Sequence, residues 1–358
     1  MSALFESYDD SRTKSLIGGG RFSVVYRLSG DEAVARRIAE DICTEQSVEF
    51  PYRFLPPGAI PDDIVGRVEE FEREFNQESE ESYLATISFA DEIAAGEFTQ
   101  FLNAVFGNIS IKRGIQLSRL IPSEAILSLC PGPRFGVSGI RELTGVAERP
   151  MLFTALKPMG LSPTDMAGLV WKLVEGGVDV IKDDHGLTNQ IFAPFEERVA
   201  RCAEAAREAN ARFGRGAIYV PNVTAPAELL MKRARRAKEL GAGGLLIAPG
   251  LAGFDAMREL AASDMGLPLF AHPAFIGSYA INRDGIAPGT LFGSLMRMAG
   301  ADATIFPNHG GRFPLAKNDC LGIAYACCED LAGFKPIFPS PAGGMDLSNI
   351  EEMVHSYG

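Results

Sequence analysis

Four ionisable side chains follow one another at the end of an apolar run, in the segment GGVDVIKDDHG at residues 176–186. If this run is a β-strand, Lys182 and Asp184 share one face and Asp183 points to the other, because side chains alternate along a strand. A lysine beside a carboxylate has three chemical interpretations. It forms a salt bridge only, it forms a Schiff base, or, once carbamylated by CO₂, it supplies an oxygen ligand to a cation such as Mg²⁺.

The elements that must position these residues alternate regularly from about residue 150 onward. Short apolar runs, each followed by an amphipathic helical segment, are typical of βα units on a parallel sheet. The runs lie near residues 153, 180, 219, 246, 270, 304 and 338. Seven such units favour a (β/α)₈ TIM-type barrel over an open doubly wound sheet, and no phosphate-binding glycine motif follows the first strand. Before them, a mixture of β-like and helical runs predicts an α+β domain over residues 1–145, with the α/β barrel over 146–358.

In a barrel of this kind the site lies at the carboxyl ends of the strands. A single lysine at a strand end is most often a solvated side chain. Here polar or small residues follow most of the predicted strands, which indicates one shared site. Read in order, they are Lys157, Lys182, Asp184, His185, Asn222, His272, Asn308 and the turn Ala342, Gly343, Gly344.

The composition excludes several classes of protein. Apolar residues make up 46% of the 358 residues and charged residues 22%, which is typical of a globular chain with a sizeable core. A net charge of −12 disfavours nucleic acid and anionic membrane surfaces as partners. The first residues, MSALFESYDDSR, lack the features of a signal peptide, and no apolar stretch is long enough to span a membrane, so we expect a cytoplasmic protein. The six cysteines have no CxxC spacing, which argues against a zinc site or a disulfide framework.

A family resemblance rests on these same motifs. The segment LFTALKPMGLSPTDMAGLVWKLVEGGVDVIKDDHG closely resembles the large chain of RuBisCO, in which one strand ends in TIKPK and the next ends in KDDE. The similarity extends over about residues 85–345. It includes VFGNISI, PNVTAPAELLMKRARRAKELG, LPLFAHPAF, PGTLFGSLMRMAGAD and the PAGG turn. The chain is therefore identified as a RuBisCO-like protein of the non-carboxylating type.

The resemblance implies a metal site and an enediolate chemistry. By position, Lys182 would be the carbamylated ligand of Mg²⁺, with Asp184 and His185 as the other ligands. Lys157 would manage the proton and the charge of the enediolate. His272 would face the substrate as a further catalytic residue.

Further positions would bind a phosphorylated sugar. Glu45 and Asn108 would reach in from the N-terminal domain, and the resemblance implies that they complete the barrel site of a second subunit in a homodimer or higher homo-oligomer. Asn222 and Asn308 are expected at the substrate. The Ala342, Gly343, Gly344 turn would hold a phosphate through backbone N–H groups.

The departures from the family pattern shape the predicted reaction. The second lysine of KPK is Met159, which argues against carboxylation, and the glutamate ligand is His185, although Mg²⁺ prefers oxygen ligands. Pro273 replaces the arginine after the family histidine. The loop-six lysine is absent, and only Asn308, His309 and Arg312 in the segment FPNHGGRFP can take its place. The chain stops at Gly358, before the family's eighth strand and glycine-rich phosphate loop, so we expect an incomplete chain or an unusual barrel.

These features predict an enzyme that forms an enediolate without net CO₂ fixation. The replaced glutamate and the FPNHGGRFP segment favour a 3-oxo-isoapionate 4-phosphate type transcarboxylase/hydrolase or decarboxylase, because an oxo acid reaches the enediolate by losing its carboxylate. The alternative is a methionine-salvage enzyme, either a 5-methylthioribulose-1-phosphate isomerase or a diketo-methylthiopentyl-phosphate enolase. A second alternative is a non-catalytic member with a decayed metal site.

Overall fold

The structure, a computed structural model, describes residues 5, 7–74, 81–313 and 315–357. The chain divides into two compact units. Unit 1 comprises residues Met1–Cys130 with Ser278–Leu291, and unit 2 comprises Pro131–Gly277 with Phe292–Gly358. The α-helices that the structure describes include none that is both long enough and apolar enough to cross a membrane.

Unit 1 is built on one five-stranded sheet, in the order β10-β4-β1-β3-β2. Its central strand β1 alternates strictly between buried and half-buried residues, so Phe22, Val24, Tyr26 and Leu28 all face one core. β10 pairs in parallel with β4 although it lies more than 160 residues further along the chain. The strands are β1 (Arg21–Ser29), β2 (Arg67–Arg73), β3 (Ser82–Ala90), β4 (Ile115–Ile121) and β10 (Gly285–Ile286).

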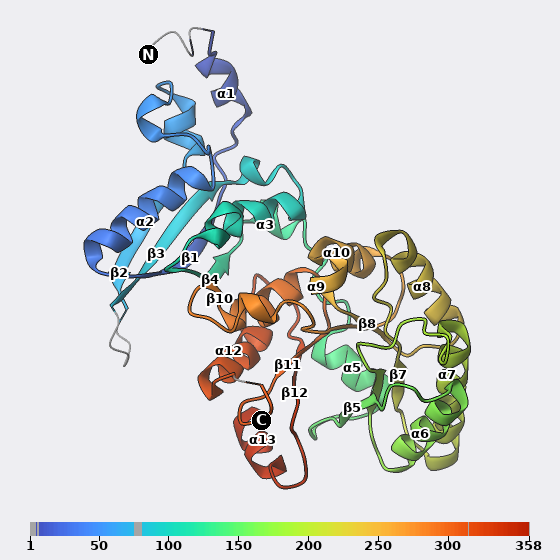
Figure 1. The fold of residues 1–358 in the computed structure, drawn as a ribbon. Coiled ribbons are helices and arrows are strands. Elements are labelled where there is room, and N and C mark those ends of the chain that lie inside the picture. The colour runs from blue at the N-terminus through green and yellow to red at the C-terminus, as the bar shows by residue number, and fades with distance from the viewer. Residues whose placement is uncertain (1–4, 6, 75–80, 314, 358) are drawn as a thin grey trace. The chain divides into compact units, whose positions relative to one another are not determined.

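Helix α2 (Glu32–Glu45) packs against β1, β2 and β3 of this sheet (Figure 1). It begins after Asp31, whose carboxylate accepts a hydrogen bond from the Val34 N–H, as expected of an N-cap. Its buried stripe is formed mainly of alanine and Ile42. The other α-helices described in unit 1 are α1 (Asp10–Leu16), α3 (Phe98–Phe106) and α4 (Glu124–Leu127). The expected α+β character is confirmed.

Unit 2 contains all seven strands predicted from the sequence. They form one three-stranded and one four-stranded parallel sheet, in the orders β5-β6-β7 and β12-β11-β9-β8. A parallel bridge between Asn222 and Leu246 joins β7 to β8, so the strands follow one another in chain order, as in a TIM-type barrel. The strands are β5 (Phe153–Leu156), β6 (Val180–Asp183), β7 (Ile218–Val220), β8 (Leu245–Ile247), β9 (Leu269–Ala271), β11 (Ala303–Pro307) and β12 (Phe338–Ala342).

The helices between these strands agree with the amphipathic runs of the sequence. Helix α6 begins with a complete capping box, in which Ser162 and Asp165 each bond the other's backbone N–H, and Pro163 occupies the first turn. The sequence did not predict α5 or α12. The helices are α5 (Gly136–Thr144), α6 (Pro163–Glu175), α7 (Phe195–Phe213), α8 (Ala227–Glu239), α9 (Pro249–Ala252), α10 (Phe254–Ala262), α11 (Met296–Met298), α12 (Lys317–Cys328) and α13 (Ile350–Tyr357).

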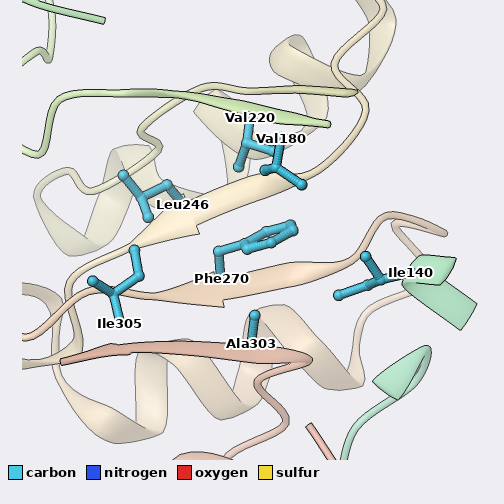
Figure 2. Close-up of a cluster of buried hydrophobic side chains, with 7 residues drawn as sticks. All are labelled: Ile140, Val180, Val220, Leu246, Phe270, Ala303 and Ile305. Carbon is cyan, nitrogen blue, oxygen red and sulfur yellow. The ribbon is translucent and has the colours of Figure 1, made fainter. Parts of the chain in front are cut away.

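Side chains from successive strands meet in the interior of unit 2. Figure 2 shows them around the ring of Phe270 on β9. The cluster consists of Ile140, Val180, Val220, Leu246, Phe270, Ala303 and Ile305, all of them at most 4% exposed. Phe153 of β5 and Phe338 and Ala342 of β12 are partly buried and pack against this cluster. The barrel interior is therefore a packed core, and any site lies beyond it, at the strand ends.

Candidate functional site

The strand pleat explains why the predicted polar residues gather above the core. Val180 and Phe270 point into the interior, so Lys182 and His272, each two residues further on, point the same way. β5 pairs with β6 in parallel, with Ala155 opposite Lys182 and Leu156 opposite Asp183. The residues that follow, Lys157 and Asp184, therefore leave the two strands side by side.

Lys157 and Asp184 form an ion pair at this position. The Lys157 Nζ lies 3.3 Å from Asp184 Oδ1, and His185 Nδ1 lies 3.6 Å from the same oxygen. Burial raises the pKa of Asp184, but the electrostatic influence of the neighbouring His185, Lys157 and Lys182 outweighs burial, and the pKa lies below its ordinary value. Asp184 is thus an ionised carboxylate that draws two basic side chains together.

Lys182 is the buried basic group of the site. Its side chain is 8% exposed and donates a hydrogen bond to the backbone oxygen of Asp183, 3.1 Å away. Burial lowers the pKa of Lys182 to about 8, against the raising effect of the Asp184 and Asp183 carboxylates. A neutral amine, the form that reacts with CO₂ or a carbonyl group, is therefore accessible near neutral pH.

The imidazole rings of His185 and His272 stack on one another. Their centroids are 4.4 Å apart and their planes are inclined by 14°. Because β6 and β9 are not neighbours, this contact crosses the mouth of the barrel. Burial and the nearby charge of Lys182 lower the pKa of His272 to about 3, so its ring is neutral. Its Nδ1 accepts the N–H of Ala274, which leaves the ring proton on Nε2.

Asp183 faces away from these residues, as the alternation predicts. It is fully buried and ion-paired with Arg198 of α7, and it also accepts the hydroxyl of Tyr219 on β7. The sequence analysis missed Arg198 and Tyr219. A signal was present for Arg198, since it occupies the apolar face of its helix with Phe195 and Cys202 and so requires a buried anion.

Asn222 and Asn308 are both buried, at 1% exposure. Asn222 donates hydrogen bonds to backbone carbonyls of the loop after β6. Asn308 accepts a hydrogen bond of 2.7 Å from the hydroxyl of Tyr357 in α13, because its position in the strand pleat turns it away from the core residues of β11. His309 also contacts α13, with its Nε2 3.2 Å from Glu352 Oε1. Substrate contact by either asparagine stays a prediction.

The Ala342, Gly343, Gly344 turn ends β12, next to the loop that follows β11. Gly343 and Gly344 have φ values of 92° and 96°, a conformation that glycine adopts without the strain of a side chain. A Cβ atom at Gly344 would lie 3.0 Å from the Cα of Gly311. Two adjacent glycines thus allow the two loops to approach closely, and the phosphate-binding role of this turn stays a prediction.

Glu45 and Asn108 meet on the surface of unit 1. Asn108 Nδ2 donates a hydrogen bond of 3.1 Å to Glu45 Oε1, and Lys112 Nζ lies 3.9 Å from Glu45 Oε2. These residues are 63 positions apart in the sequence, and both were predicted to contact substrate. The structure brings them together in one exposed polar patch.

Among the residues that the structure describes, the side chains at the strand ends do not form a metal site by themselves. Across residues 5, 7–74, 81–313 and 315–357, no group of three or more histidine, cysteine or acidic side chains is placed to hold one. Asp184 and His185 are adjacent, but the neighbouring Lys157 and Lys182 are basic. The set suits Mg²⁺ only if Lys182 carries a carbamate, which would replace a positive charge with anionic oxygen.

Comparison with known proteins places this site in a family. Residues 136–311 match the family profile described as ribulose bisphosphate carboxylase large chain, catalytic domain. Over 338 residues the chain is 37% identical to ribulose bisphosphate carboxylase-like protein 1 of Rhodopseudomonas palustris, which covers 94% of this chain and 89% of that protein. The chain is a RuBisCO-like protein of the RuBisCO large-chain family.

Two further comparisons bear on this RuBisCO-like protein. It is 34% identical to a 5-methylthioribulose-1-phosphate isomerase of Rhodospirillum rubrum, over 94% of this chain and 88% of the isomerase. The crystal structure of a Rubisco-like protein from Rhodopseudomonas palustris superposes with a TM-score of 0.85 at 37% identity, covering 94% of this chain and 92% of that one. The fold class expected from the sequence is confirmed.

Proposed function

We propose that this RuBisCO-like protein isomerises a phosphorylated keto-sugar with a thioether end, of the 5-methylthioribulose 1-phosphate type, through an enediolate. The observation that carries the proposal is the ion pair between Lys157 and Asp184 at the ends of β5 and β6. The similarity to the Rhodospirillum rubrum isomerase along most of both chains supports this substrate class. It supports the methionine-salvage alternative better than the oxo-sugar acid reaction that the sequence motifs favoured.

The isomerisation has two chemical requirements that side chains of the site must meet. A proton must leave the carbon next to the carbonyl group and return to another carbon, and the oxygens between them must carry negative charge meanwhile. Lys157, half exposed at the site, carries the mobile proton, and its ammonium form stabilises the negative charge. His272 donates a hydrogen bond from its Nε2–H group to a substrate oxygen and keeps the proton, since its Nδ1 already accepts the N–H of Ala274.

Mg²⁺ is part of the proposal, held by carbamylated Lys182, Asp184 and His185. When bound, it would supply a Lewis acid that polarises the substrate oxygens. To form the carbamate, the neutral amine of Lys182 would attack CO₂ and release one proton to solvent, and its lowered pKa of about 8 makes the neutral form available. Asp184 is ionised and orients Lys157 through their ion pair.

We also propose a homodimer or higher homo-oligomer with shared sites. The exposed patch of Glu45 and Asn108 on unit 1 would supply substrate contacts to the barrel site of a second copy. This assignment explains why an amide and a carboxylate are paired on an exposed surface, where the pair contributes little to stability by itself.

The test is a comparison of substrates with purified protein, Mg²⁺ and bicarbonate. Conversion of 5-methylthioribulose 1-phosphate to an isomer, followed by ³¹P NMR, would support the proposal. Release of CO₂ from a 3-oxo-sugar acid phosphate, without isomerisation of the thioether sugar, would support the oxo-sugar acid reaction instead. No reaction with either substrate would favour a non-catalytic member. Incorporation of CO₂ into ribulose 1,5-bisphosphate is not expected, because Met159 replaces the family lysine.

A further inference from the structure

The loop after β6, residues 184–194, carries Asp184 and His185 and is held from its buried side by Asn222. The Asn222 Nδ2 donates to the backbone oxygens of His185 and Leu187, at 2.8 and 2.9 Å. Its Oδ1 accepts the N–H of Thr224 at 3.1 Å. A side-chain amide has two N–H donors, and both are used here. Asn222 therefore has no donor left for a substrate unless the loop is released.

Arg198 holds the same loop further along. Its Nη1 donates to the backbone oxygen of Ala193 at 2.7 Å, and its Nη2 donates to that of Thr188 at 2.9 Å. Its Nε donates to Asp183 Oδ2 at 3.2 Å, and the side chain is fully buried. The guanidinium group thus binds two backbone oxygens of the loop and the carboxylate of Asp183, the last residue of β6.

Asp183 connects Asn222 and Arg198 in one hydrogen-bond network. Its Oδ2 accepts the backbone N–H of Asn222 at 3.0 Å as well as Arg198, and its Oδ1 accepts the hydroxyl of Tyr219 at 2.7 Å. We call Asp183, Arg198, Tyr219 and Asn222 the buried clamp. Asp183 ends β6, Arg198 lies in α7, Tyr219 lies in β7, and Asn222 is the second residue after β7. None of the four is more than 1% exposed.

We propose that the buried clamp is the positioning device of the site, and that Asn222 is a positioning residue rather than a substrate ligand. Asp184 lies between Asp183, which the clamp fixes, and His185, whose carbonyl Asn222 fixes. With the backbone held on both sides, the Asp184 carboxylate is directed at Lys157, and the His185 ring is directed at His272. The catalytic part of this inference rests on the proposed function, but its geometric part does not.

The chain offers a matched control in Asn210, at the other end of α7. Its side-chain amide also bonds only to backbone, donating to the Ala217 oxygen at 2.8 Å and accepting the Ala217 N–H at 2.9 Å, whereas Asn222 makes three such bonds. An Asn→Asp change at either position removes the N–H donors of the side chain, of which Asn222 uses two and Asn210 one, and places a carboxylate oxygen against a backbone carbonyl. Both changes disturb a turn next to β7, but only Asn222→Asp disturbs the loop that carries Asp184 and His185.

The experiment uses the four histidines of the chain as reporters. The full chain is labelled with ¹³C at histidine Cε1, and His→Gln variants assign the signals. In Asn222→Asp we expect the signals of His185 and His272 to move or broaden, while those of His309 and His355 stay in place. In Asn210→Asp we expect all four to stay. With an active substrate, Asn222→Asp should lower kcat by about 10- to 100-fold with little change in KM, as for other residues that orient a site from behind.

Two results would overturn the proposal. One is a folded Asn222→Asp protein whose His185 and His272 signals coincide with those of the wild type. The other is equal movement of all four signals, which would mean general loosening. If the Asp variant does not fold, Asn222→Ser, which keeps one uncharged donor, is measured in its place, and the same two results for the histidine signals would overturn the proposal. The NMR readout needs no substrate, so inactivity of the wild type on the thioether sugar would contradict the proposed function and leave this result standing.

Discussion

Lys157 Nζ lies 3.3 Å from Asp184 Oδ1, although the two residues are 27 positions apart in the sequence. The parallel pairing of β5 and β6 accounts for the contact, because Leu156 lies opposite Asp183 and both chains leave the sheet one residue later. The ion pair is thus set by strand register. Its lysine is half exposed while its carboxylate is mostly buried, so the lysine is the solvent-accessible member of the pair.

Replacing Lys157 by methionine should reduce isomerisation by about 10²- to 10⁴-fold, the range for loss of a proton-transfer group. Stability should change by less than about 1 kcal/mol, because the lysine is half exposed and solvent screens the pair. The matched control is Lys172→Met on the exposed surface of α6, which should keep wild-type activity. Initial rates and urea unfolding of both variants check this. Equal activity in the two variants would exclude Lys157 from the chemistry.

Lys182 should form a carbamate that ¹³C-bicarbonate labels and Mg²⁺ stabilises. Its pKa of about 8 sets the pH dependence. Below this pKa the amine is protonated and cannot react with CO₂, and above it the amine is neutral, so labelling at fixed CO₂ should rise between pH 7 and 9. ¹³C NMR measures the carbamate signal, and Lys182→Met should lack it. A signal of equal size in Lys182→Met would place the carbamate on another amine.

Arg198→Met should lower the free energy of unfolding by about 3–5 kcal/mol, because it leaves Asp183 charged and buried without its cation. Adding Asp183→Asn should recover part of this loss by removing the uncompensated charge. The control is Arg201→Met on the exposed side of the same helix, where the Glu197 pair contributes about 0.2–1 kcal/mol. Urea unfolding measures all three. A loss for Arg198→Met no larger than that of the control would contradict the burial of this ion pair.

If each site is shared between two subunits, mixing two inactive variants should restore part of the activity. Asn108→Ala removes the amide of the exposed patch on unit 1, and Lys157→Met removes the amino group at the barrel site. Random pairing of equal amounts in a dimer leaves one intact site in half of the dimers, so about one quarter of wild-type activity should return. The measurement is activity after the variants are unfolded together and refolded. A mixture as inactive as its parents would show that each chain completes its own site.

Much of the site was predictable because it depends on strand geometry alone. The period of two placed Lys182 with Asp184 and turned Asp183 away, and the parallel sheet placed Lys157 beside them. Asn308 follows Pro307 at the end of β11, and its contact with substrate stays a prediction. Its position in the pleat is opposite to that of Ala303 and Ile305, and its side chain accordingly contacts α13 rather than the space above the core.

Other features depend on contacts that a sequence does not state. The stacking of His185 on His272 joins strands that are not neighbours, so it depends on how the sheet curves. Helix α12 was missed because its sequence, KNDCLGIAYACC, has no clear polar stripe and contains Gly322. Arg198 was detectable in principle, but choosing Asp183 as its partner required knowing how α7 packs against β6.

The central claim is that the residues around Asp184 exchange a proton on the carbon next to a keto-sugar carbonyl. The most direct test incubates 5-methylthioribulose 1-phosphate with the protein, Mg²⁺ and bicarbonate in D₂O, and follows that C–H signal by ¹H NMR. We predict that deuterium from the solvent enters this position at a rate that falls sharply in Lys157→Met. Full retention of the proton while the wild-type protein binds the sugar phosphate would contradict the account.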